Sequence, residues 1–155
     1  MKDIIRKARA DDLPELRKLA RNTIDKSYRS FLRDEGLDNY IFSGESDNEI
    51  KNNIDNCCVF LKDGSIAGFT LYSEDLIRLI MVDEKFQRSG IGSELLAHAE
   101  SQVRAYGADL MRVHIFERNR QAVSFFRDRG WTPAGRDMDR ELNIPLLLFE
   151  KRARD

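Results

Sequence analysis

A short polar segment at residues 83–93 holds the residues of this chain best suited to chemistry. It follows an apolar run at residues 76–82 and carries Gln87, Gly90 and Gly92 as Gln-x-x-Gly-x-Gly before an amphipathic helix. The first amides of a helix lack intrahelical partners, and the helix dipole favours an anion there. Glycine has no Cβ to block close approach. The segment therefore predicts a phosphate pocket, although the glycines alone would also suit a tight turn.

The hydrophobic pattern around this segment predicts a layered mixed α/β fold. The run at residues 76–82 is typical of a strand buried on both faces, and Asp63-Gly64 between two apolar runs indicates a hairpin. The charged segment 137–143 is expected to be a loop. We predict strands at residues 4–8, 59–61, 66–72, 76–82, 110–116, 131 to about 138 and 146–151. We predict helices from about residue 12, within 24–42, at 47–56, from 92 to about 106 and from 119 to about 129.

The length, charge balance and cysteine content exclude several classes of protein. The 155 residues include 26 basic and 27 acidic side chains, a balance that argues against binding nucleic acid by phosphate neutralisation. We expect residues 1–155 to form one domain, without a metal site. The adjacent Cys57 and Cys58 are interpreted as buried thiols of a cytoplasmic protein. No apolar run reaches the ~18 residues of a membrane span, and no signal peptide is recognised at the N-terminus.

Two segments in register resemble motifs of the GCN5-related N-acetyltransferase (GNAT) family. The first is similar to Gln/Arg-x-x-Gly-x-Gly/Ala and reads Gln87-Arg88-Ser89-Gly90-Ile91-Gly92. The second is similar to Leu-Glu-Val-x-x-x-Asn-x-x-Ala-x-x-Phe-Tyr-x-x-x-Gly-Phe and comprises Val113-His114-Ile115-Phe116, Asn119, Ala122, Phe125-Phe126 and Gly130-Trp131. The resemblance implies the family fold, in which helices cover both faces of a mostly antiparallel central sheet. That sheet splays between the strands 76–82 and 110–116.

The resemblance also implies an acyltransferase that uses acetyl coenzyme A. In the family, the glycine turn holds the diphosphate through its amides, and the strand before it pairs with the pantetheine arm. Asn119 would lie beside that arm, although it also suits a helix N-cap without any such contact. The residues expected to bind the cofactor are Ile80, Met81, Val82, Gln87, Arg88, Ser89, Gly90, Ile91, Gly92, Ser93, Asn119 and Phe126.

The general base is predicted from the same resemblance. In the branch that acetylates ribosomal proteins, a glutamate five residues before the asparagine is proposed as the base, and this chain has His114 there. A histidine suits proton abstraction near neutral pH, because its reference pKa is ~6.5. On a strand it could equally serve a structural hydrogen bond. Glu74 and Asp75, at the entry to the strand 76–82, are the alternative bases.

Phe126 is the clear departure from the family pattern. Many relatives have a tyrosine here, whose hydroxyl is thought to protonate the leaving thiolate, whereas phenylalanine has no proton to give. Tyr72, Tyr28 or water would then supply that proton. The alternative is that the chain is a non-catalytic module that binds and senses acyl coenzyme A.

The acceptor is expected to be a primary amine of a small molecule, peptide or protein. In the family it binds near the region between the first two strands, here residues 23–56, so Tyr28 and Phe31 are expected at its site, together with Tyr72 as a possible proton source. The aromatic residues of that region could equally pack helices onto the sheet. A surplus of acidic residues there mildly favours a cationic acceptor. Neither nucleic acid nor membrane is expected as a partner, and the protein is expected to be a monomer or a homodimer.

Overall fold

The computed structural model describes residues 3–42, 44–140 and 142–153 of the chain. Seven strands and five α-helices are assigned within these residues. The strands are β1 (Ile4–Lys7), β2 (Cys57–Lys62), β3 (Ser65–Ser73), β4 (Leu76–Val82), β5 (Leu110–Phe116), β6 (Thr132–Asp139) and β7 (Ile144–Arg152). The helices are α1 (Leu13–Tyr28), α2 (Asp34–Phe42), α3 (Glu45–Asn52), α4 (Ile91–Ala105) and α5 (Arg120–Arg127). None of the helices in the described part of the chain is both long and apolar enough to cross a membrane.

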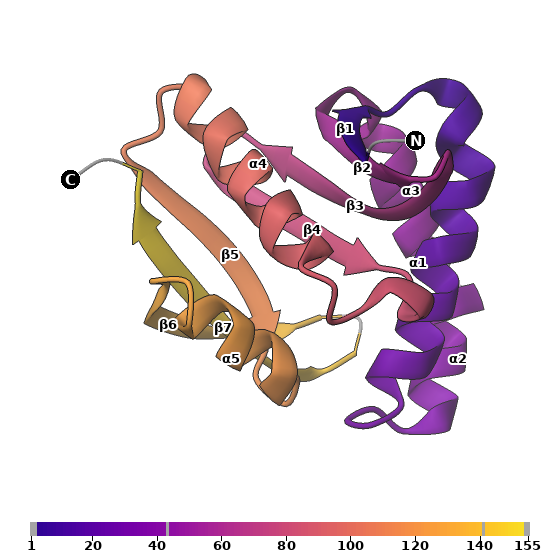
Figure 1. The fold of residues 1–155 in the computed structure, drawn as a ribbon. Coiled ribbons are helices and arrows are strands. Elements are labelled where there is room, and N and C mark those ends of the chain that lie inside the picture. Colours follow the sequence, from indigo (N-terminus) through magenta and orange to yellow (C-terminus); the bar gives the residue numbers. More distant parts are fainter. Residues whose placement is uncertain (1–2, 43, 141, 154–155) are drawn as a thin grey trace.

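The strands form one sheet in the order β1-β2-β3-β4-β5-β7-β6. Every neighbouring pair is antiparallel except β4 and β5, which are parallel. These two strands pair only at Leu76 with Arg112 and Ile77 with Val113. Beyond that point they diverge, and Figure 1 shows their arrowheads pointing apart. The predicted mostly antiparallel sheet, splayed between 76–82 and 110–116, is therefore confirmed.

Helices cover both faces of the sheet, as predicted. On one face, α1, α2 and α3 contribute Leu16, Leu37 and Ile50 to a core cluster that includes Phe69 and Met81. On the other face, α4 and α5 pack on two further clusters, which contain Leu95, Leu96, Val113, Phe126 and Trp131. Side chains alternate between the faces of a strand, so neighbouring residues of β4 and β5 belong to different clusters.

Local turn chemistry fixes several of the connections. Asp63 and Gly64 both have positive φ (51° and 83°), as the two central residues of a type I′ hairpin turn require. The Asn119 side chain accepts a hydrogen bond from the Ala122 amide at 3.3 Å and caps α5. Gly107, with a φ of 90°, follows the last turn of α4. The hairpin turn at Asp63-Gly64 and the helix cap at Asn119 were both expected from the residue types.

Two expectations from the sequence are corrected. The predicted loop at 137–143 is shorter, because β6 continues to Asp139 and β7 begins at Ile144. Residues of β6 are almost all exposed, so this edge strand lacks the apolar alternation that marks a half-buried strand. Strand β4 is not buried on both faces: Arg78 is exposed, and several of its neighbours are only half-buried. A β-bulge causes part of this, because Leu71 pairs with Leu79 and Tyr72 pairs with Ile77, which leaves Arg78 without a partner on β3.

Candidate active site

A cavity of about 710 Å³ occupies the gap between the diverging strands β4 and β5. Its walls include residues from both faces of the sheet. Ile80 and Val82 pack with the clusters under α4 and α5, whereas Leu79 and Met81 pack with the cluster under α1–α3. The cavity therefore passes through the sheet and has two halves. We call them the α4 half, lined by Gln87, Arg88, Gly90, Gly92, Ser93, Phe125, Phe126 and Arg129, and the α1 half, lined by Thr23, Ser27, Tyr28, Tyr40, Glu49, Arg78, His114 and Asp139.

The α4 half is built around the turn that leads into α4. Arg88 and Gly90 have φ values of 64° and 87°, so the chain reverses sharply just before the helix. Successive amides in such a turn form a concave, partly positive surface suited to an anion. Gln87 Nε2 donates to the carbonyl of Val82 at 3.2 Å and ties the turn back to β4. Gly92 sits under the Phe125 ring, where a Cβ would lie 3.5 Å from the nearest ring atom.

The amides of this turn are open to a ligand. Within the described residues, the backbone N–H groups of residues 88–93 donate to no protein oxygen, and no side chain caps the N-terminus of α4. The first intrahelical bond runs from the Glu94 amide to the Gly90 carbonyl, at 3.1 Å. Unpaired amides at a helix N-terminus favour an anionic ligand.

Arg129 adds a guanidinium beside these open amides. Its Cζ lies 3.8 Å from the centroid of the Phe125 ring. Its Nε donates to Ser93 Oγ at 3.0 Å, and its Nη1 donates to the Phe125 carbonyl at 2.9 Å. Within the described part of the chain it forms no ion pair with a carboxylate. The α4 half thus contains a fixed positive charge that no protein acid neutralises.

The α1 half combines aromatic rings with carboxylates. The Tyr28 ring packs against Phe31 and Phe116, with centroids 5.2 and 5.4 Å apart. Burial, with the nearby charges of Glu49 and Asp139, raises the pKa of Tyr28 to about 12. Burial also raises the pKa of Tyr40 and of the Glu49 carboxyl. Asp139 Oδ1 accepts the Leu142 amide at 2.8 Å in the turn between β6 and β7.

The structure brings most of the expected cofactor residues together along the cavity. The lining includes Ile80, Met81, Val82, Gln87, Arg88, Gly90, Gly92, Ser93, Asn119 and Phe126. Two others lie outside the lining. The Ser89 hydroxyl donates to the Phe86 carbonyl within the turn, and the Ile91 side chain is buried in the core below α4.

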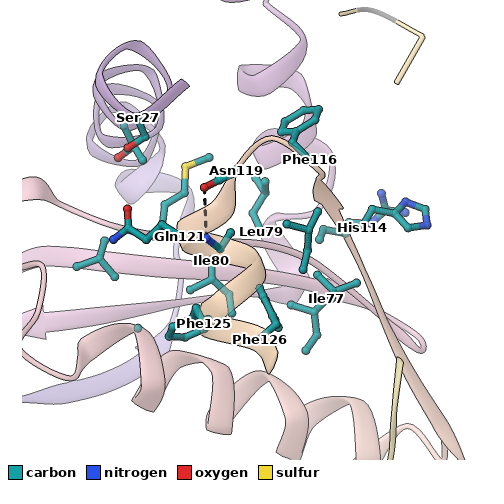
Figure 2. A pocket seen from close by; sticks show the side chains of 18 of the residues that line it. Ser27, Ile77, Leu79, Ile80, His114, Phe116, Asn119, Gln121, Phe125 and Phe126 are labelled. Atoms are coloured by element: carbon teal, nitrogen blue, oxygen red, sulfur yellow. Dashed lines mark hydrogen bonds between the residues drawn. The ribbon is translucent and has the colours of Figure 1, made fainter. Parts of the chain in front are cut away.

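The expected catalytic and acceptor residues are scattered. His114 lines the cavity but is exposed, and Figure 2 shows it turned outward from β5, away from Phe125 and Phe126. Glu74 and Asp75 lie in the turn between β3 and β4, outside the cavity lining. There Asp75 forms an ion pair with Arg112 at 3.3 Å.

The three expected tyrosine and phenylalanine positions also separate. Tyr28 lines the cavity, whereas Phe31 packs behind it. Tyr72 is buried on the α4 side of the sheet, outside the cavity lining, and its hydroxyl lies 3.6 Å from Cys58 Sγ. Cys57 and Cys58 are free and buried, and burial raises the pKa of Cys57 to about 12.

Sequence reasoning missed Arg129, Arg78 and Asp139, and it counted Glu49 only among the surplus acidic residues of segment 23–56. Arg129 directly precedes the Gly130-Trp131 pair of the second motif, and that position was its only signal. Glu49 and Asp139 come from α3 and β6, and no local pattern marked them as neighbours. Among the described residues, no group of three histidine, cysteine, aspartate or glutamate side chains could hold a metal ion.

The splayed sheet and the open helix N-terminus define an acyltransferase architecture, and the sequence agrees. The profile of the family described as "Acetyltransferase (GNAT) family" matches residues 15–131. The match covers more than half of the chain, so the chain belongs to the GNAT family of acyltransferases. No curated protein matches the chain.

Solved structures with the same fold cover almost the whole chain. PaiA N-acetyltransferase from Thermoplasma acidophilum, in complex with coenzyme A, has a TM-score of 0.81 at 21% identity, covering 98% of this chain and 99% of that one. A GCN5-related N-acetyltransferase from Rhodopseudomonas palustris has a TM-score of 0.85 at 16% identity, with coverages of 98% and 96%. The ribosomal-protein-S18-alanine N-acetyltransferase from Escherichia coli has a TM-score of 0.70 at 16% identity, with coverages of 98% and 94%. At these identities the likeness shows the fold.

Proposed function

We propose that this protein transfers an acetyl group from acetyl coenzyme A to a primary amine, by direct attack in a ternary complex. The observation that carries this proposal is the cavity through the sheet, with unpaired amides at residues 88–93 at one end. Such a cavity allows the donor to enter from the α4 face and the acceptor from the α1 face. Holding both reactants in line can contribute roughly 7–11 kcal/mol to lowering the barrier.

The residues of the α4 half fit coenzyme A. The amides of residues 88–93 and the Arg129 guanidinium would hold its diphosphate. The edge of β4 that faces β5 is unpaired beyond Ile77, so the main chain of residues 80–82 could pair with the pantetheine arm as an added strand. The coenzyme A complex of the Thermoplasma relative supports this choice of donor.

Proton transfer must work without the tyrosine that many relatives have at the position of Phe126. Of the two tyrosines considered as replacements, Tyr28 lines the cavity, and Tyr72 is buried elsewhere. A phenol with a pKa of about 12 is a weaker acid than a thiol, whose reference pKa is ~8.5. Complete transfer from Tyr28 to the thiolate would therefore be uphill. We propose that Tyr28 donates a hydrogen bond to the leaving sulfur, that coenzyme A leaves as the thiolate, and that the thiolate is protonated from the neutral solution after it leaves, because its parent pKa is ~8.5.

A second candidate function is a non-catalytic acyl coenzyme A sensor, and Phe126 is the observation that favours it. The cytoplasmic location also stays a prediction, supported by the two free, buried cysteines.

The test is incubation with acetyl coenzyme A and a panel of amines, including polyamines, amino acid esters and peptide N-termini. Thiol release and the mass of the acetylated product are measured. Turnover with at least one amine is expected. Heat of coenzyme A binding without any turnover would support the sensor instead. Phe126→Tyr adds a second comparison, because a marked gain in rate would mean that thiolate protonation limits an active enzyme.

A further inference from the structure

One carboxylate in the α1 half, that of Glu49, forms no hydrogen bond or ion pair within the described residues. We propose that Glu49, on α3, binds the amino group of the acceptor and accepts its proton as the amine attacks the thioester. This inference rests on the proposed acetyl transfer and adds the identity of the base. Glu49 lines the cavity together with Tyr28 and Tyr40.

The Glu49 carboxylate is unusual because it is partly buried without a partner. Its main-chain carbonyl accepts hydrogen bonds from Asn53, at 3.2 Å from the amide nitrogen and 2.8 Å from Nδ2. Within the described residues, however, its side chain forms no hydrogen bond or ion pair. Removing a carboxylate from water without a compensating donor is costly. A ligand that brings an N–H group into the cavity would supply that donor.

The groups around Glu49 suit an amine. Arg78 faces it from β4, Tyr28 from α1, Tyr40 from α2, and its own helix contributes Glu45. Asp139, on β6, lies close enough to influence both tyrosines. Two carboxylates and one guanidinium therefore line this half, with phenols that can donate or accept hydrogen bonds. The surroundings favour a neutral or cationic amine over an acidic acceptor.

These surroundings also suit a proton acceptor. Burial raises the pKa of the Glu49 carboxyl, and the positive charge of Arg78 opposes that rise. A raised pKa brings a carboxylate closer to the working pH, where general bases are most effective.

The two other candidate bases in the lining are less well placed. The His114 side chain is exposed and turned outward from β5 (Figure 2). One oxygen of Asp139 already accepts the Leu142 amide. Glu49 is the partly buried carboxylate whose two oxygens are both free of protein donors within the described residues.

The proposed step balances without any further reactant. The nitrogen lone pair of the neutral amine forms the new C–N bond, and the C–S bond breaks with its electron pair leaving on sulfur. The amine proton moves to a Glu49 carboxylate oxygen and from there to water. The thiolate takes one proton from water, so the products are the acetylated amine and free coenzyme A.

The test compares Glu49→Gln with a matched control, Glu35→Gln. Glu35 is exposed on α2 and lies outside the cavity lining. Both substitutions replace a glutamate by glutamine, so they make the same change in net charge. With an amine that the wild-type chain acetylates, Glu49→Gln is expected to lower kcat/KM roughly 10²- to 10⁴-fold. It should also make the fall in kcat/KM toward acidic pH less steep, because only protonation of the acceptor amine would then contribute to that fall. Glu35→Gln should keep the wild-type rate and pH profile, and both variants should bind coenzyme A with wild-type affinity in calorimetry.

The glutamine variant is expected to fold. Because the folded-state pKa of Glu49 is raised, the folded chain binds this proton more tightly than the unfolded chain. The Glu49 carboxyl therefore contributes its full stabilisation at a pH below its pKa in the unfolded chain. This stabilisation is lost as the pH rises through its pKa in the folded chain. At pH 7 the ionised carboxylate destabilises the fold, so Glu49→Gln should have a Tm at least as high as the wild type. A thermal melt at pH 7 and pH 4 verifies this.

Two results would overturn the proposal in distinguishable ways. If the wild type is active and Glu49→Gln is equally active, Glu49 is not the base and the proposed function stands. The same conclusion follows if His114→Gln, and not Glu49→Gln, changes the fall in kcat/KM toward acidic pH. If the wild-type chain acetylates no amine, the proposed function fails, and the role of Glu49 fails with it.

Discussion

The single residue with the most defined contacts in the α4 half is Arg129, which the sequence did not single out. Stacking on Phe125 and hydrogen bonds to Ser93 and the Phe125 carbonyl hold its guanidinium beside the unpaired amides. Little side-chain entropy remains to be lost when a phosphate binds, because the protein has already ordered this group. An ordered arginine that has no acidic partner within the described residues is suited to bind an anionic group.

We predict that Arg129→Gln weakens coenzyme A binding roughly 10- to 100-fold, as expected for the loss of a hydrogen-bonded charge. Isothermal calorimetry measures the affinity directly. Arg127→Gln is the matched control, because Arg127 is exposed on α5 and lies outside the cavity lining. Equal affinities for the two variants would show that Arg129 only supports the packing of α5.

At the scale of elements, the position of β4 depends on one glycine of β3. A Cβ added at Gly68 would lie 2.8 Å from the Met81 carbonyl oxygen and 3.0 Å from Leu95 Cδ1. The first of these is a backbone atom of β4, so an added Cβ would force β3 and β4 apart. Gly68 thus allows the close packing that sets the edge of β4 at the cavity.

We predict that Gly68→Ala destabilises the protein by about 1–3 kcal/mol, the usual cost of overpacking. Gly36→Ala is the matched control, because Gly36 lies in α2 with nothing within 4 Å of the added Cβ. That substitution should stabilise the protein by roughly 0.5–1 kcal/mol, because alanine is the better helix former. Urea unfolding measures both changes. A Gly68→Ala variant as stable as the wild type would show that β4 can shift freely.

The bounds of some strands could be predicted from the sequence more accurately than those of others. Strands β4 and β5 were predicted with their observed bounds, because a continuous or alternating apolar run determines them locally. Strand β6 was predicted to within about one residue at each end, but its last residues were also assigned to the loop 137–143, because an exposed edge strand has no apolar pattern to mark its end.

The two halves of the cavity also differ in how far the sequence could predict them. The turn at residues 87–93 is contiguous, so its glycines alone predict where its amides point. The α1 half takes Tyr28 from α1, Glu49 from α3, Arg78 from a β-bulge and Asp139 from β6. These residues become neighbours only through the packing of helices on the sheet. The family resemblance already placed Tyr28 at the acceptor site, but no spacing in the sequence marked the other three as its neighbours.

At the scale of the whole molecule, the sheet consists of two parts that are weakly joined. Strands β1–β4 form one part and β5–β7 the other, and only two residue pairs connect β4 to β5. Figure 1 shows α4 lying over β3 and β4 of the first part, and α5 lying near the end of β5 in the second. A ligand that fills the gap would contact both parts and supply the hydrogen bonds that the diverging strands leave unmade.

We therefore predict that coenzyme A slows hydrogen exchange most strongly at the amides of residues 79–82 and 88–93. At a hundred times its dissociation constant, a ligand stabilises the bound form by about 2.7 kcal/mol, which corresponds to exchange slowed roughly 100-fold wherever opening requires release. The amides of residues 136–138, on the far edge strand β6, serve as the internal control and should exchange at unchanged rates. Mass spectrometry of peptides or NMR follows these sites. Protection confined to α1–α3, with none at residues 79–93, would mean that coenzyme A binds elsewhere and that the open amides at α4 serve another anion.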